Sequence, residues 1–428
     1  MVRRELLGGS YRPIITEISK IALFLAEIPV NIVLMNSEAI RNPHKAHQNN
    51  SFNDLSGFNG VKDTTEKYLL LPRFDGDLKE GIVELVDLRN FQTLHTWNID
   101  VDTVWDNLKK NNGSKWRDIF KDNNDKRYQY THPLLLNDGS ILFADNSPLI
   151  KINKKNKVVW IMDDEPYHHS KEQDIDGNIW VCVRYNPHKV DDKIVDKTVD
   201  NYYDDGIRKI SPDGEIIFDK SMINIFHDNG MEYLLYAVGD RNFTYDPIHL
   251  NDIQPVNKDS KYWKKGDVFL SLRHQSMVIL YRPSTNKIIW KSAGKFHHQH
   301  DVDILDDKRI SIFDNNSKDF YNGDVVDGFN RIVIYDFETQ NYNYHYNKFL
   351  EEQDVRTVTD GRSQILPNGD LMVEETTFGR ILYFGLDGSL KWSYVNRAED
   401  NYVYFISWSR ILYEDNDINK VTQFLNQN

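Results

Sequence analysis

The sequence predicts an all-β protein: a six-bladed β-propeller with four-stranded blades, preceded by an N-terminal helical extension. Two observations carry this prediction. From Tyr68 onward, short runs rich in Ile, Leu, Val, Tyr and Trp alternate with Asp-Gly, Asn-Gly or Lys-Asn turns, and only residues 104–121 show the longer apolar period of a helix. A unit of four such strands also recurs along the chain, and repetition of a four-stranded unit is typical of propellers.

The chain before the predicted propeller reads as a separate segment. We assign residues 1–66 to a helix and an irregular lead-in, and residues 67–428 to the propeller. The apolar run 21–35 contains Glu27 and Pro29 and is shorter than the roughly 20 apolar residues that cross a bilayer. It also lacks a clear small-residue cleavage site, so it does not indicate a signal peptide. We expect an amphipathic helix that packs on the propeller or associates with a membrane surface.

Each predicted blade is a set of four short strands. Five sets start near His132, His169, His249, His300 and Ser363. A partial set at 68–97 has three strands, and the last strand-like stretch, 402–413, belongs to no set of its own. We expect that stretch to supply the missing strand, because closing the ring hides the sheet edges. Insertions at strand connections often carry function, and four occur here, at 185–205, 219–248, 252–265 and 317–330.

Composition limits the classes of function. The formal net charge is −13, from 52 basic and 65 acidic residues. This argues against a broad nucleic-acid surface, which needs clustered Lys and Arg. Cys182 is the only cysteine, so the chain can form neither an internal disulfide nor a cysteine-rich metal site. The predicted partners therefore do not include nucleic acid.

Histidines stand at the starts of the first strands in four predicted blades. First strands line the central channel of a propeller and run in the same direction, so residues at their starts surround one mouth of the channel. The four are His132, His169, His249 and His300. We interpret His132 as a structural residue, because a proline follows it, whereas the repetition at the other three positions indicates a site. Arg73 and Arg184, which end two second strands, are interpreted as solvated or ion-paired.

The histidine motifs resemble the signature of the bacterial arylsulfate sulfotransferases. The segments that carry the resemblance are Gln299-His300-Asp301 with Phe313-Asp314-Asn315, His249-Leu250-Asn251 with Ser271-Leu272-Arg273-His274-Gln275, and His168-His169 before Asp176-Gly177-Asn178. As a repeat pattern it extends from Tyr68 to the C-terminus. The resemblance implies a six-bladed propeller that moves a sulfuryl group from an aryl sulfate ester to a phenol through a sulfohistidine, without a nucleotide sulfate donor.

Matched residue by residue, the resemblance makes His300 the nucleophile and gives His169 and His249 assisting roles, with Asn251 and Arg273 holding the sulfuryl oxygens. It implies no metal and no cofactor, an aryl sulfate donor and a phenol acceptor as partners, and a periplasmic or membrane-associated location. The residue types suit this chemistry. Imidazole, with an unperturbed pKa of about 6.5, is a neutral nucleophile near pH 7. Arginine and histidine donors stabilise charge on the transferred group, a second histidine can protonate the leaving phenolate, and transfer in two steps gives ping-pong kinetics.

Two other functions fit the same residues. A metal-dependent propeller hydrolase would use the histidines with Asp301 or Asp314 to bind zinc or another transition metal. The sequence shows no regular His-x-His or His-x-x-x-His pair, and an arginine beside the cluster disfavours a cation. A propeller that binds a ligand without catalysis is the third reading, since a fold does not fix function. A scaffold alone does not need Arg273 and Asn251 beside three channel histidines.

Overall fold

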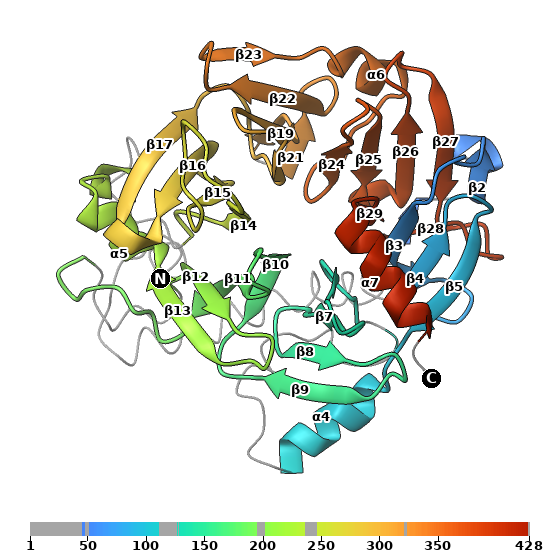
Figure 1. Ribbon diagram of the computed structural model, residues 1–428, viewed down its shortest axis with the longest axis horizontal. Helices are drawn as coiled ribbons and strands as arrows, with labels where there is room; N and C mark the ends of the chain where they lie inside the picture. The colour runs from blue at the N-terminus through green and yellow to red at the C-terminus, as the bar shows by residue number, and fades with distance from the viewer. Residues whose placement is uncertain are drawn as a thin grey trace, which may run out of the picture. The chain divides into compact units, whose positions relative to one another are not determined.

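The computed structural model describes residues 45–47, 51–110, 126, 128–194, 202–235, 246–320 and 323–426. The predicted helix at 21–35 lies outside these residues. Ala46–Asn428 form one compact unit, in which six sheets stand in a ring around a central channel (Figure 1). Within each blade, neighbouring strands are antiparallel and follow one another from the channel outward, except that the first strand of blade 1 comes from the C-terminal part of the chain. The predicted six-bladed β-propeller is confirmed.

The blades have these strands. Blade 1 contains β29 (Arg410–Leu412), β3 (Tyr68–Asp75), β4 (Glu80–Asp87) and β5 (Gln92–Trp97), and blade 2 contains β6 (Leu134–Leu135), β7 (Ile141–Phe143), β8 (Leu149–Ile152) and β9 (Val158–Met162). Blade 3 contains β10 (Tyr167–Gln173), β11 (Ile179–Tyr185), β12 (Asp204–Ile210) and β13 (Ile216–Ser221), and blade 4 contains β14 (Leu250–Pro255), β15 (Val268–Leu272), β16 (Met277–Arg282) and β17 (Lys287–Ala293). Blade 5 contains β18 (Val302–Ile304), β19 (Arg309–Asp314), β22 (Arg331–Asp336) and β23 (Asn341–Asn343). Blade 6 contains β24 (Arg362–Ile365), β25 (Leu371–Glu375), β26 (Arg380–Phe384) and β27 (Leu390–Val395), with β2 (Gly57–Gly60) as a fifth, outer strand.

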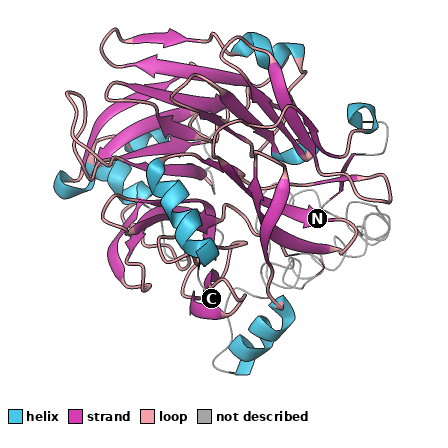
Figure 2. Ribbon diagram, turned by 45° about the vertical axis from the view of Figure 1, so that its right-hand side comes forward, coloured by secondary structure: helices cyan, strands magenta, loops and turns pink. Residues whose placement is uncertain are grey.

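The remaining elements are short, and strands dominate the described chain (Figure 2). The helices are α4 (Val101–Lys110), α5 (Met222–Asp228), α6 (Asn347–Glu352) and α7 (Asp415–Asn426), with 3-10 turns at Ser51–Asp54, Glu232–Leu234, Pro283–Thr285 and Thr376–Phe378. The other strands are β1 (Lys45–His47), β28 (Val403–Tyr404), and the hairpin β20 (Ser317–Phe320) and β21 (Gly323–Val326), which lies in the insertion 317–330. Among the described residues, no helix is long and apolar enough to cross a membrane.

The hydrophobic core is divided among the six interfaces between neighbouring blades. Each of six main clusters of buried side chains draws on two adjacent sheets, as in the cluster where Trp392 of blade 6 packs with Leu69 and Ile411 of blade 1. The C-terminal helix α7 adds Phe424 to the interface of blades 1 and 2, where its ring centroid lies 5.0 Å from that of Trp97. The burial of these faces holds the blades in a ring.

Ring closure depends on the C-terminal strand. β29 pairs with β3 from the start of the propeller, with Arg410 opposite Leu70. The fully buried carboxylate of Glu374, on β25 of blade 6, accepts hydrogen bonds from the backbone N–H groups of Trp408 (2.7 Å) and Ser409 (2.5 Å). One side chain therefore fixes the chain immediately before its closing strand.

Removing this acceptor should destabilise the ring. We expect Glu374→Ala to lower the free energy of unfolding by about 3 kcal/mol, because it leaves two buried N–H groups without their charged acceptor. Glu374→Gln keeps one acceptor oxygen and should cost about 1 kcal/mol. Urea denaturation of both variants measures this, with the exposed Glu338→Ala as the matched control, expected within about 0.5 kcal/mol of wild type. If Glu374→Ala and Glu338→Ala lowered the free energy of unfolding equally, the result would contradict a role of Glu374 in closing the ring.

Candidate active site

The structure brings the four channel histidines together at one end of the channel. The ring centroid of His169 lies 5.8 Å from that of His132, 5.4 Å from that of His249 and 6.1 Å from that of His300. His132 also stacks on Trp408, with 4.1 Å between centroids. Imidazoles contributed by four blades are thus near enough to face one small anion.

Irregular backbone aims these rings. His132, His169 and His249 have φ values of 48°, 50° and 51°, in the left-handed region that side chains other than glycine seldom adopt. The pairing register of β10 shifts just after His168, and the register of β14 shifts between Leu250 and Asp252. Bulges of this kind redirect side chains, and strained backbone of this kind collects at functional sites.

A cavity of about 410 Å³ opens beside the cluster. His132, His169 and His249 line it, together with Thr359 and Asp360 from the start of blade 6. Its lining does not include His300, Asn251 or Arg273, whose side chains are buried. Of the five predicted site residues, His169 and His249 therefore line the cavity and the other three do not.

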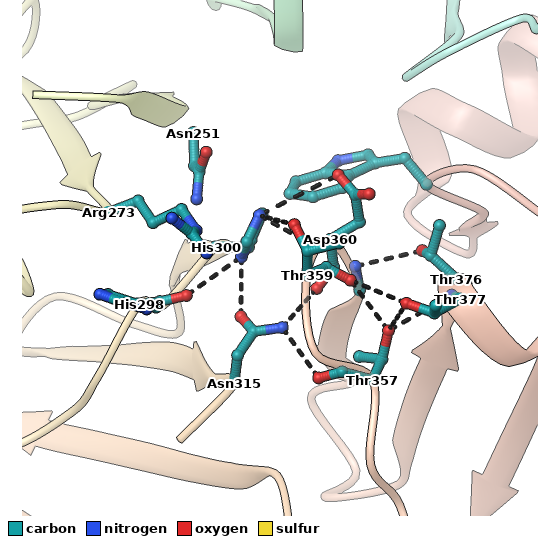
Figure 3. A network of polar contacts seen from close by, with 12 residues as sticks. Asn251, Arg273, His298, His300, Asn315, Thr357, Thr359, Asp360, Thr376 and Thr377 are labelled. Carbon is teal, nitrogen blue, oxygen red and sulfur yellow. Dashed lines mark hydrogen bonds and ion pairs between the residues drawn. The ribbon is translucent and has the colours of Figure 1, made fainter. Parts of the chain in front are cut away.

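His300 is fully buried, and hydrogen bonds on both ring nitrogens fix its tautomer (Figure 3). Its Nδ1 lies 2.7 Å from Oδ1 of Asn315, whose Nδ2 donates to the carbonyl oxygens of Asp360 (2.8 Å) and Thr357 (3.2 Å). Since Asn315 presents its oxygen, Nδ1 of His300 carries the hydrogen and Nε2 has the lone pair. The backbone N–H of Asp360 donates to this Nε2 at 3.0 Å.

Burial keeps this ring neutral. It lowers the pKa of His300 to about 3, against the opposing effect of the hydrogen bond to Asn315, and Arg273 lowers it further. Partial desolvation raises the pKa of Asp360 above its ordinary value, opposed by His249 and Arg273, although 37% of its side chain is exposed. At neutral pH, His300 is therefore an uncharged imidazole with a lone pair on Nε2, which is the form that a nucleophile requires.

Asn251 and Arg273 point toward His300 from one side, and Thr359 and Asp360 from the other (Figure 3). Asn251 donates through Nδ2 to the carbonyl of Gln299 (3.0 Å), and its buried Oδ1 has no hydrogen-bond partner among the described residues. Arg273 donates through Nη2 to Asp324 on the β20–β21 hairpin (2.7 Å). Its buried Nε has no hydrogen-bond partner among the residues that the structure describes. Both side chains thus hold polar groups that a ligand could engage.

The other two arginines are ion-paired, as predicted. Arg73 lies 2.6 Å from Glu84, and Arg184 lies 3.1 Å from the fully buried Asp205. Burial alone would raise the pKa of Asp205, but Arg184 and His168 lower it below its ordinary value. Both arginines therefore complete ion pairs, and Arg184 also lines the cavity.

Several residues of the site have no counterpart among the predicted ones. Histidines stand at the starts of the first strands in other blades, but Thr359 and Asp360 take this position in blade 6 and Trp408 takes it in blade 1. Asp360 and Trp408 also have left-handed backbone, with φ of 55° and 68°. Their signal is positional: each precedes the first strand of its blade. Asn315 lies within a motif that the resemblance uses, but its hydrogen bond to His300 follows only from the fold.

Three donor atoms in the cavity could hold a metal ion. Those of His132, His169 and Asp360 all lie within 4.8 Å of one another, and Nδ1 of His132 is buried without a hydrogen-bond partner among the described residues. The carboxylates expected for a metal site are elsewhere. Asp301 accepts from the backbone N–H of Ser363 (3.0 Å), and Asp314 pairs with Arg331 (2.5 Å).

Comparison with known proteins gives one informative match. The family model described as arylsulfotransferase (ASST) matches residues 132–397, more than half of the chain. No curated protein matches the chain. Among solved structures, a protein of unknown function from Bacteroides caccae is 11% identical, with 80% of this chain and 98% of that chain covered and a TM-score of 0.46. TolB from Acinetobacter baumannii is 10% identical, with 81% of this chain and 66% of that chain covered and a TM-score of 0.42.

Proposed function

Because the chain belongs to the arylsulfotransferase family, we propose that it moves a sulfuryl group from an aryl sulfate ester to a phenol through a sulfohistidine at His300, without a nucleotide sulfate donor. The family and the propeller fold support a sulfotransferase-type function. One observation carries the finer proposal: Asn315 fixes the tautomer of a neutral, buried His300, so its Nε2 offers a lone pair, and the ring of His169 lies 6.1 Å away between centroids.

Transfer takes two displacements at sulfur. In the first, Nε2 of His300 attacks sulfur, the N–S bond forms, and the aryl oxygen leaves with the electron pair of the S–O bond and takes up a proton. In the second, the acceptor oxygen attacks the same sulfur, the N–S bond breaks toward Nε2, and the phenol gives up its proton. Two of the histidines that line the cavity, His169 and His249, carry out the protonation and the deprotonation.

The N–H of Asp360 has a part in this scheme. It donates to the lone pair that must attack sulfur, so a small shift of residues 359–361 accompanies attack. Once Nε2 carries the sulfuryl group, this N–H is close to the sulfuryl oxygens and can donate to one of them. Arg273 and Asn251 approach from the opposite side. Donors fixed around the developing charge stabilise the transition state.

Mass spectrometry tests the covalent step. We expect the protein, exposed briefly to 4-nitrophenyl sulfate, to gain a sulfuryl group on the peptide that contains His300. Addition of phenol should remove the group and yield phenyl sulfate. An adduct on His169 or His249 instead would overturn the assignment to His300, and absence of both adduct and transfer would overturn the proposed function.

A metal-dependent hydrolase is the second candidate, and the donor atoms of His132, His169 and Asp360 favour it. Two imidazoles and a carboxylate are a donor set typical of zinc and other transition metals. Metal analysis of the purified protein, with activity measured before and after a chelator, separates the candidates. Stoichiometric metal together with loss of activity on chelation would favour the hydrolase.

A further inference from the structure

The imidazole of His249 is in hydrogen-bond contact with a carboxylate. Its Nδ1 lies 2.7 Å from Oδ2 of Asp246, three residues earlier in the chain. A carboxylate accepts hydrogen bonds, so Nδ1 carries the hydrogen, and Nε2 is the nitrogen left for the cavity that His249 lines. No described carboxylate pairs with His169 in this way. Of the two histidines given assisting roles, His169 and His249, only His249 has the arrangement of an Asp–His pair among the described residues.

The backbone that carries Asp246 is held in place. Nδ1 of His274 lies 2.6 Å from the backbone carbonyl of Asp246, and Nε2 of Gln275 donates to the carbonyl of Pro247 (2.6 Å). The ring of His274 also packs on that of His249, with 4.5 Å between centroids. The turn after β15 thus fixes the segment that carries Asp246, and fixed partners of this kind orient a reacting imidazole.

We propose that Asp246 is a positioning residue for sulfuryl transfer, which makes His249 the acid and base of the reaction. Asp246 holds the Nδ1–H tautomer and stabilises the imidazolium that exists while Nε2 also carries a proton. In the first displacement, Nε2–H of His249 gives its proton to the leaving aryl oxygen and His249 becomes neutral. In the second, Nε2 takes the proton of the attacking phenol, which restores the imidazolium. This inference rests on the proposed function.

Two donors that differ in leaving group test the role of the pair. Phenol has a pKa of about 10, as tyrosine does, so phenolate leaves poorly without a proton. 4-Nitrophenolate is a far weaker base and leaves unassisted. We expect Asp246→Asn to lower kcat/KM about a hundredfold with phenyl sulfate, within the usual range for acid–base catalysis, and about threefold or less with 4-nitrophenyl sulfate. His249→Gln should show the same selectivity, and the double variant should add little, because the two residues act as a unit.

The matched control is Asp307→Asn, in an exposed turn of blade 5, which should leave both donors unaffected. If Asp246→Asn lowered kcat/KM equally with the two donors, the acid–base role would be overturned, because a structural defect does not distinguish leaving groups. Nitrogen-15 NMR of the imidazoles tests the positioning separately: the Nδ1–H signature of His249 should be lost in Asp246→Ala. An unchanged signature would overturn the pairing. If the wild-type protein transfers from neither donor, the proposed function falls, and the NMR result alone decides on the Asp246–His249 pair.

Discussion

His300→Ala is expected to abolish transfer from phenyl sulfate to a phenol, with a loss of about 10⁴-fold or more. Removing a nucleophile that forms a covalent intermediate eliminates the reaction path, and losses of this order or larger follow in enzymes that use one. The sulfuryl adduct should disappear together with turnover. Steady-state rates with both substrates, and the mass of the protein after exposure to the donor, measure the two effects.

The loss of transfer in His300→Ala tests the role of the nucleophile only if the variant remains folded. His300 is buried and bonded to Asn315 and to the N–H of Asp360, so alanine should lower the free energy of unfolding by about 1–3 kcal/mol without unfolding the chain. The exposed His345→Ala serves as the matched control and should keep wild-type rates. Turnover of His300→Ala within tenfold of wild type, from a folded protein, would show that another group attacks sulfur.

The fold could be predicted because its signal is local and repeated. Each blade carries the same alternation of short apolar runs and turn residues, and a propeller is the arrangement that closes such units without open edges. The stretch that contains β29 could be assigned to the first blade because that blade lacked a strand. The helix α7 has no place in the repeat, and no repeat pattern predicts it.

The site could be predicted in part, because strand starts converge at one channel mouth whatever the details of each strand. The direction of each side chain could not. It depends on left-handed backbone at His169 and His249 and on bulges in β10 and β14, which the alternation of strand residues does not reveal. Asp246 was missed for a similar reason. Only the fold brings the turn at residues 274–275 against it, and only this contact turns a nearby aspartate into a partner of His249.

Arg273→Met is expected to lower kcat/KM about a thousandfold. The sulfuryl group carries its charge on three outer oxygens, and removal of one fixed donor to such a charge costs about a hundredfold to a thousandfold in other enzymes. Arg273 suits this role because Asp324 holds one end of its guanidinium while Nε has no partner among the described residues. Arg273→Lys keeps the charge but loses the planar fork, so its loss should be smaller, about tenfold to a hundredfold.

Whether the loss in Arg273→Met appears in kcat or in KM shows at which stage Arg273 acts. If it meets charge that develops during transfer, kcat falls along with kcat/KM. A rise in KM at unchanged kcat would show that it only binds the donor and would contradict the role argued for it. Asp324→Asn should give a milder loss of about tenfold, since the guanidinium remains but is less firmly held. Arg309→Met, which removes an exposed arginine paired with Asp306, is the matched control and should leave both constants unchanged.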